Sequence, residues 1–231
     1  MGTSKDYSGQ TGGAWTSSKR IATRLARQGP DDKLIRAYAR SHVDALGSAS
    51  QAATTAGTAV RAAARLGGIL QGAAQRGWTA ALTESGLARA IGQPAVSMVL
   101  LLADLLAGEG ATLEDVAARE AIIDCLTEEF AGRTYDEVEA TPLDAAKVLE
   151  IVIRFVARFV YHRALVLLSK SLNETDPARR QQIEGQLRNW AESTAKLELA
   201  GADVRQFDPI GAAGQALAED LVLRAYSVFA G

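Results

Sequence analysis

The most informative pattern along the chain is a segment at about 143–171, in which charged side chains recur every three or four residues and most other positions are apolar. On an α-helix this spacing gathers the charges into one narrow stripe and leaves most of the circumference apolar. Such a helix packs at the centre of a bundle, because neighbouring helices on several sides are needed to bury so much apolar surface. The stripe consists of Asp144, Lys147, Glu150, Arg154, Arg158 and His162.

Narrower apolar faces at helical spacing occupy most of the remaining chain, and no alternating pattern typical of a β-strand persists. We therefore predict an all-α fold, a multi-helix bundle around the central apolar helix 143–171. The expected helices span 17–28, 32–46, 49–76, 78–84, 86–91, 95–107, 113–131, 134–139, 143–171, 178–199 and 212–230.

The five prolines all lie where these helices are expected to begin or end. Asp31 is placed to cap the helix that follows it. The pairs Thr141–Pro142 and Asp176–Pro177 each put a capping oxygen before a proline at the first helical position, where the missing N–H costs nothing.

The beginning of the chain differs from the rest. The first fourteen residues contain four Gly, two Ser and two Thr, and no Val, Leu or Ile. Such a segment cannot bury enough apolar surface to offset the entropy that it would lose on ordering. We therefore predict a flexible tail over residues 1–16 and one helical domain over residues 17–231.

Composition supports the helices and narrows the chemistry. Of the 231 residues 44 are Ala, and only 6% are aromatic, a mixture that favours helices over strands. The single cysteine, Cys125, excludes a disulfide framework and a Cys-based metal site, so we expect a structural thiol. His42 and His162 are expected to be hydrogen-bonded helix residues. We predict no catalytic constellation, no bound cofactor and no metal, and thus a non-enzymatic protein.

The net charge of −2 conceals an asymmetry. Residues 1–92 hold 12 Lys and Arg against 5 Asp and Glu, whereas residues 93–231 hold 13 against 22. The helical domain thus divides into a basic front half, 17–92, and an acidic bundle half, 93–231. The basic side chains could dock on an acidic surface, or they could face the phosphates of a nucleic acid. The docking patch would comprise Lys19, Arg20, Arg24 and Arg27, extended in the nucleic-acid alternative by Lys33, Arg36 and Arg40.

A Gly/Ala-rich stretch leaves a further alternative open. Gly68 and Gly72 form a GxxxG pair, which permits close helix packing inside a protein or, in a membrane effector, within a bilayer. However, the most apolar run, 95–107, is shorter than the roughly 20 residues of a membrane-spanning helix, and the polar start does not resemble a signal peptide. We expect a cytoplasmic protein that does not bind a membrane.

Several short features occur in a characteristic order. The chain starts Met1-Gly2-Thr3-Ser4, continues with a polar Tyr/Ser/Gly segment and Trp15, and then enters a basic helix. Ala-Arg-Gln-Gly follows at 26–29, and a Gly/Ala/Arg stretch at 61–77 precedes Leu-rich and acidic helices. In this order the features resemble the QatB family over most of the chain.

The resemblance implies a component of the bacterial four-gene Qat anti-phage defence system. Its partners would be a QueC-like enzyme (QatC) and, within the same system, an ATPase (QatA) and a TatD-like nuclease (QatD). The resemblance further implies that Gly2, uncovered by removal of Met1, accepts a covalent 7-deazaguanine-type group from QatC, on which the helical body docks. The residues that this enzyme would recognise are Thr3, Ser4, Tyr7 and Trp15.

Overall fold

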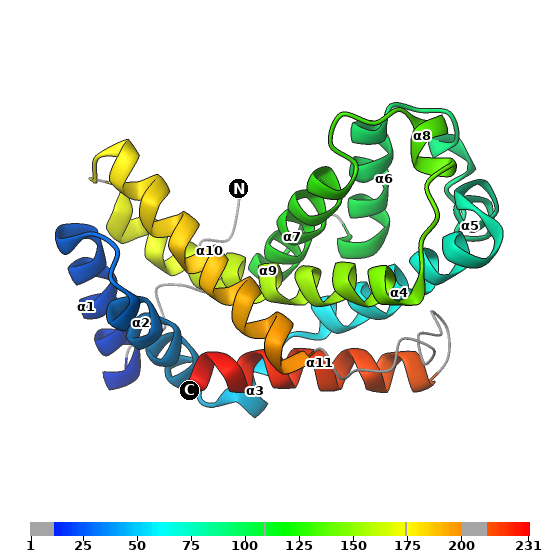
Figure 1. The fold of residues 1–231 in the computed structure, drawn as a ribbon. Helices are drawn as coiled ribbons and strands as arrows, with labels where there is room; N and C mark the ends of the chain where they lie inside the picture. The colour runs from blue at the N-terminus through cyan, green and yellow to red at the C-terminus, as the bar shows by residue number, and fades with distance from the viewer. Residues whose placement is uncertain (1–11, 109, 174, 200–211) are drawn as a thin grey trace.

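A computed structural model describes residues 12–108, 110–173, 175–199 and 212–231. These residues form eleven α-helices, one short 3-10 helix and no strand, which confirms the predicted all-α fold (Figure 1). The elements are α1 (Gly13–Gln28), α2 (Asp32–Ala45), α3 (Ala49–Thr54), α4 (Gly57–Arg76), α5 (Trp78–Glu84), η1 (Ala88–Ala90), α6 (Ala95–Ala107), α7 (Leu113–Glu129), α8 (Tyr135–Glu139), α9 (Ala145–Leu172), α10 (Pro177–Leu199) and α11 (Ala212–Ala230).

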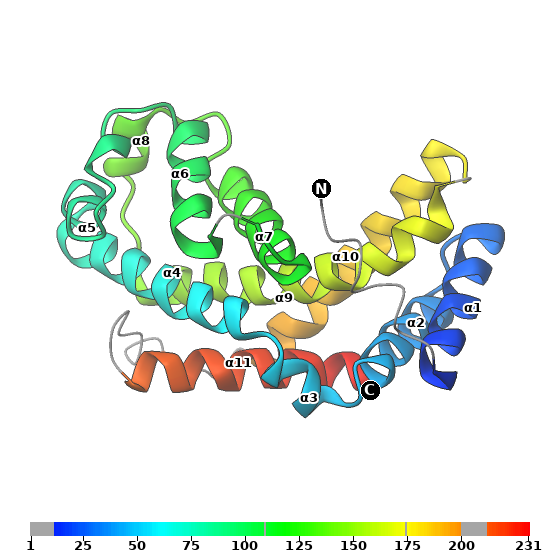
Figure 2. The same cartoon turned by 180° about the vertical axis from the view of Figure 1, so that it is seen from behind.

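Helix α9 is the central helix that the charge pattern predicts. Sixteen of its 28 residues are buried, and it packs against α1, α4, α7, α10 and α11. Figures 1 and 2 view opposite faces and show α10 crossing one face of α9 and α4 lying against the other. Helices α1 and α2 lie at one end of the molecule, and α5, α6 and α8 lie at the other.

Both charge halves of the sequence contribute to one continuous hydrophobic core. Leu25 and Leu70 from the basic half share this core with Phe155 and Tyr226 from the acidic half. Helix α11 makes this possible, because it packs against α2, α3 and α4 as well as against α9 and α10.

The first helix begins at Gly13, four residues before its predicted start and inside the predicted tail. Gly12 occupies the N-cap position and has no side chain with which to cap the helix. Buried residues then recur at Trp15, Ser18, Ala22 and Leu25 along one face of α1. The early start therefore depends on tertiary packing of Trp15, which a local search for capping residues does not detect.

The Gly/Ala-rich stretch predicted as one helix at 49–76 divides into α3 and α4. Ala56 is the N-cap residue of α4, and its methyl side chain cannot accept a hydrogen bond from the first turn. Instead, the carboxylate of Glu114 on α7 accepts a hydrogen bond from the backbone N–H of Thr58 at 2.7 Å. On the other side of the break, Arg163 of α9 donates to the carbonyl of Ala52 at 3.2 Å and to Thr55 Oγ1 at 2.9 Å.

The capping predictions have mixed outcomes. Asp31 and Asp176 accept hydrogen bonds from the backbone of α2 and α10, as predicted. The prediction at Thr141–Pro142 is wrong, because α9 begins at Ala145 and Asp144 caps it by accepting from the N–H of Lys147 at 2.7 Å. The carboxylate of Asp144, directly before α9, therefore caps this helix in place of the Thr141 hydroxyl.

The GxxxG pair lies in α4, and Gly72 faces α5. A Cβ atom built on Gly72 would lie 3.4 Å from the Cβ of Ala81 on α5, which is an ordinary van der Waals contact, so the helix contact at this position also has room for a small side chain. Twelve residues of α4 are buried in the core. No helix in the described parts of the chain has the combined length and hydropathy needed to cross a bilayer.

Candidate docking surface and modification site

The predicted modification residue and most of its recognition residues precede the described part of the chain. Gly2, Thr3, Ser4 and Tyr7 all lie outside the described residues. Trp15 is described, and only 9% of its surface is exposed. Its indole meets the imidazole of His42 edge to face, with 6.2 Å between the ring centroids. This placement does not support direct partner contact at Trp15, because the ring anchors α1 to α2.

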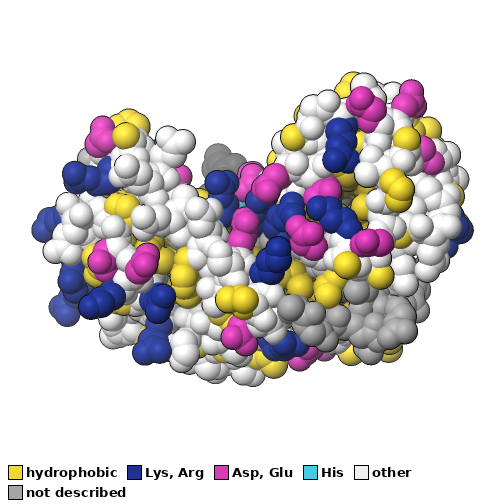
Figure 3. Space-filling view, in the orientation of Figure 1, with side chains coloured by type: hydrophobic (Ala, Val, Ile, Leu, Met, Phe, Trp, Pro, Cys, Tyr) yellow, Lys and Arg dark blue, Asp and Glu magenta, His cyan; other side chains and the backbone are white. Residues whose placement is uncertain are grey.

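The opposite side of α1 is strongly basic. Its four predicted docking residues are all exposed, and two further exposed cations continue the surface on α2. Within the described residues none of these six side chains forms an ion pair, so their charge is available to a partner. Figure 3 shows Lys and Arg gathered over α1 and α2 at the left of the molecule. This basic surface consists of Lys19, Arg20, Arg24, Arg27, Lys33 and Arg36.

Beside the basic surface lies a groove of about 990 Å³ bounded by α1, α2, α10 and α11. Its apolar lining includes Ile21, Ala37, Trp190 and Val228, which are all partly exposed. Sequence reasoning found the cations but missed this groove. It assigned Trp190 to a helix face that packs on the central helix. The pattern within one helix does not show which side chains of that face the neighbouring helices leave partly exposed.

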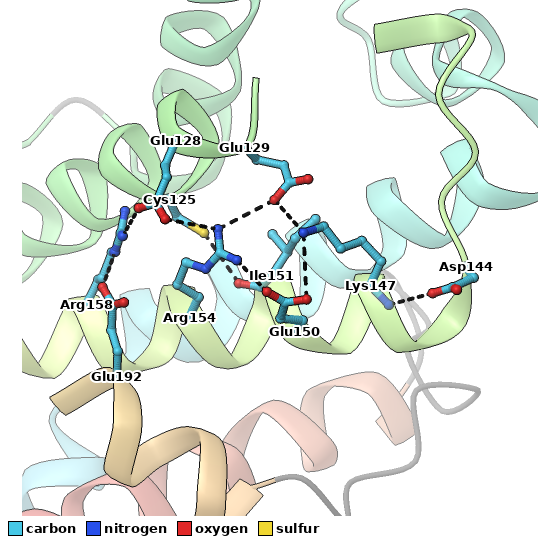
Figure 4. A network of polar contacts seen from close by, with 10 residues as sticks. All are labelled: Cys125, Glu128, Glu129, Asp144, Lys147, Glu150, Ile151, Arg154, Arg158 and Glu192. Carbon is cyan, nitrogen blue, oxygen red and sulfur yellow. Dashed lines mark hydrogen bonds and ion pairs between the residues drawn. The ribbon is translucent and has the colours of Figure 1, made fainter. Parts of the chain in front are cut away.

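A second polar cluster lies where α7, α9 and α10 meet (Figure 4). The side chain of Arg158 on α9 is only 3% exposed; its Nε donates to Glu192 of α10 at 2.7 Å, and its Nη2 donates to Glu128 of α7. Next to it, Arg154 Nη2 donates to Glu150 at 2.6 Å. The charged stripe of the central helix is therefore covered by an ion-pair network.

This network favours the ionised form of Glu128. The hydrogen bond from Arg158 lowers the pKa of Glu128 below its usual value, and the charges of Arg158 and Arg154 act in the same direction. Lys147 Nζ completes the network by pairing with Glu129 at 2.8 Å. The network thus joins α7, α9 and α10 through side chains that are 30 and 34 residues apart in the sequence, and it accounts for most of the polar stripe on α9.

The other residues that could take part in chemistry are Cys125, His162 and the carboxylates. Burial raises the pKa of Cys125 to about 12, and its Sγ lies 3.5 Å from the carbonyl oxygen of Ile151, which confirms a structural thiol. His162 Nε2 lies 2.8 Å from Asp124, so this histidine is hydrogen-bonded as predicted. Among the described residues, no three His, Cys, Asp or Glu side chains converge as metal ligands would.

The prediction of a hydrogen-bonded His42 is wrong. His42 is 1% exposed, and among the described residues neither of its ring nitrogens has a hydrogen-bond partner. Burial, together with the nearby charge of Arg163, lowers the pKa of His42 to about 3. Ser18 Oγ on α1 is likewise buried without a hydrogen-bond partner in the described part of the chain.

Comparison with known families now identifies the chain. The family profile described as Qat anti-phage system associated protein QatB matches residues 47–229. This chain belongs to the QatB family. It is therefore a component of an anti-phage defence system. The match begins at Gly47, after α1 and α2, so the basic surface and the predicted modification residues precede the matched part. Neither a curated protein nor a solved structure matches the chain.

Proposed function

We propose that this QatB-family chain is a non-enzymatic defence component whose Gly2 amine receives an acyl group from the QueC-like partner QatC. The observation that carries the docking part is the basic surface on α1, the helix that directly follows the N-terminal segment, because its cations form no ion pair with the described residues. Gly12 lies ten positions after Gly2, and an extended chain spans at most about 3.6 Å per position. The amine therefore lies within about 36 Å of α1, and a partner holding it would lie near the basic surface.

The proposed reaction is an acyl transfer to the N-terminus. QatC would activate a 7-deazaguanine carboxylate as an acyl adenylate: the carboxylate attacks the α-phosphorus of ATP, and pyrophosphate leaves. The neutral α-amine of Gly2 attacks the carbonyl carbon, a C–N amide bond forms, AMP leaves, and the amine proton passes to solvent. An α-amine with a pKa near 8 has about a tenth of its molecules neutral at pH 7, and glycine adds no side chain that would hinder the attack.

Intact-mass measurement after co-expression with QatC tests the modification. One acyl group should be added, and after cleavage at Lys5 it should reside on the peptide 2–5. Gly2→Pro should abolish the adduct, because it replaces the primary amine with a hindered secondary amine. Gly9→Pro is the matched control, since it alters the same segment and leaves the amine intact. An unchanged mass, or an adduct that persists in Gly2→Pro, would refute the proposal.

The docking part has a separate test. Reversing two cations of the basic surface, Arg20→Glu with Arg24→Glu, should lower the modification rate about tenfold at low salt, because electrostatic steering accelerates association. The matched control is Arg89→Glu with Arg133→Glu, the same charge change on exposed residues elsewhere. Equal rates for the two double variants would exclude the basic surface as the docking site.

A nucleic-acid adaptor remains a second candidate, because the same exposed cations fit a phosphate backbone. Binding of a labelled 20-mer duplex should then weaken steeply with salt, and Arg20→Glu with Arg24→Glu should reduce the slope of log K against log salt by about two. An unchanged slope in this variant would remove the candidate. The membrane alternative has no such support, since the Gly/Ala-rich helix α4 is buried in the core.

A further inference from the structure

The groove between α1, α2, α10 and α11 combines an apolar floor with a basic rim. Trp190 of α10 forms part of the floor; its ring packs edge to face against Phe229, with 4.7 Å between the centroids. Ile21 from α1 and Val228 from α11 continue the floor on either side. These partly exposed side chains leave apolar surface in contact with water beside a cavity large enough for several side chains.

The rim cations form a line along one helix. Lys33, Arg36 and Arg40 are spaced three and four residues apart, so they share one face of α2, and all three line the groove. Arg40 is held in place by donating to the carbonyls of Ala230 and Gly231 at 2.8 and 3.2 Å. Three cations thus follow the groove over about 10 Å, at 1.5 Å per residue.

We propose that this groove binds an acidic amphipathic helix of a partner protein. In helix-in-groove recognition, apolar side chains spaced i, i+3, i+4 and i+7 enter the groove. Asp or Glu side chains beside them, at the same spacing, would meet the three cations of α2. Charge complementarity sets the orientation and the on-rate, and the apolar floor supplies affinity. The proposal goes beyond the Gly2 reaction and does not depend on it.

The floor favours a peptide over a nucleic acid as the occupant. Single-stranded nucleic acids bind by stacking bases on aromatic faces along a basic track. Here Ile21, Ala37 and Val228 are aliphatic, and they match the aliphatic anchors of a helix. Among the described residues that line the groove, the one acidic side chain is Asp44, which follows Arg40 by four residues at one end of the cation line. A partner helix would therefore carry its acidic residues opposite Lys33, Arg36 and Arg40 and avoid them opposite Asp44.

The probe is a fluorescein-labelled peptide of about 18 residues with Leu at i, i+3, i+4 and i+7 and Glu flanking these positions. Anisotropy titration at about 50 mM salt should show saturable binding to the full chain. A scrambled peptide of identical composition should bind at least about tenfold more weakly, because its apolar side chains do not share one face. Equal affinity for the two peptides would overturn the proposal.

Groove variants locate the binding. Lys33→Glu with Arg36→Glu changes exposed side chains only and should weaken binding about tenfold or more. The double variant of Arg89 and Arg133 described above should bind like the wild type. If both double variants bind the peptide equally, the electrostatic attraction is nonspecific, and the groove is excluded as the binding site. Stronger binding of a single-stranded 16-mer DNA than of the amphipathic peptide would assign the groove to nucleic acid instead.

Trp190 provides a readout inside the groove. It is partly exposed, whereas Trp15 and Trp78 are buried, so its emission should shift to shorter wavelength when the peptide covers it. Trp190→Phe retains an aromatic floor and should bind the peptide within about threefold of the wild type, but without the emission shift. A shift that persists in Trp190→Phe would place the peptide elsewhere and overturn the proposal.

Discussion

Removing both carboxylates that pair with Arg158 should destabilise the protein far more than removing either one. The Arg158 side chain is 3% exposed, so its charge depends on Glu128 and Glu192 for compensation. With one carboxylate remaining, the guanidinium still has an anionic partner. With both replaced by Gln, a buried cation loses its counter-charges and keeps only neutral acceptors, which bind it more weakly.

The magnitude follows from the exposure of the partners. Breaking a fully buried ion pair costs about 3–5 kcal/mol. Here the side chains of Glu128 and Glu192 are 58% and 28% exposed, so water reaches the site and reduces the cost. Because each Gln also keeps a hydrogen-bond acceptor, we expect a loss of about 2–3 kcal/mol for the double variant and below about 1 kcal/mol for each single variant.

Arg158→Met added to the double variant supplies the decisive comparison. An apolar side chain of similar length removes the uncompensated charge while filling most of its volume, so the triple variant should regain most of the lost stability. Urea unfolding followed by circular dichroism at 222 nm measures this, with a midpoint shift of about 1 M for the double variant. Asp220→Asn, which breaks an exposed pair with Arg224, should cost no more than about 0.5 kcal/mol. A triple variant as unstable as the double variant would refute the buried-charge argument.

The network also predicts a pH dependence with a defined sign. The pKa of Glu128 is lowered in the folded state, chiefly by the hydrogen bond from Arg158. The folded state therefore binds fewer protons than the unfolded state, and the stabilising contribution of Glu128 is present above its unfolded pKa of about 4.3. This contribution is lost as the pH falls through the lower folded pKa. The stability difference between wild type and Glu128→Gln should accordingly shrink between pH 6 and pH 3, and a constant difference would contradict the assignment.

Three further predictions concern single positions. Gly77→Ala should lower the free energy of unfolding by about 2–3 kcal/mol, because φ at Gly77 is +84° and the new Cβ would lie 2.7 Å from the Glu139 carboxylate that caps α5. Gly86→Ala should cost only about 1–2 kcal/mol, because φ is similar at +77° but no atom lies near the new Cβ. Equal urea midpoints for the two variants would contradict this difference. Cys125 should resist iodoacetamide at pH 8 for hours and react fully in urea, so rapid labelling of the folded protein would disprove its burial. The pKa of His42 is lowered to about 3 in the folded state, against about 6.5 unfolded, so as the pH falls from 6 to 5 the wild type should lose about 1 kcal/mol more stability than His42→Phe, and parallel curves would contradict the assignment.

Much of the secondary structure followed from local pattern. Segment 95–107 is a helix with the predicted bounds. Both ends are marked by adjacent residues in the sequence, Pro94 before the apolar run and Gly108 after it. The central position of α9 was predictable from its own sequence, since a helix with so narrow a polar stripe needs neighbours around most of its circumference. The exposed cations of α1 were also predictable, because charge at helical spacing defines a face.

Other features depended on residues brought together from distant parts of the chain. The break between α3 and α4 is stabilised by Glu114 and Arg163, which lie more than 50 residues away from it. His42 was expected to have a hydrogen-bond partner. In the structure Trp15 of α1 packs against its ring, and neither ring nitrogen has a partner among the described residues.

The sequence by itself determined the all-α class, the central helix, the basic first helix and the resemblance to the QatB family. These properties depend on composition, periodicity and short motifs, all of which are local. The tertiary structure alone decided where α1 begins, which carboxylates compensate Arg158, and that α2, α10 and α11 enclose a basic-rimmed groove. The physical reason is that helix ends, buried charges and grooves depend on which surfaces meet, and the pattern within one helix does not specify its neighbours.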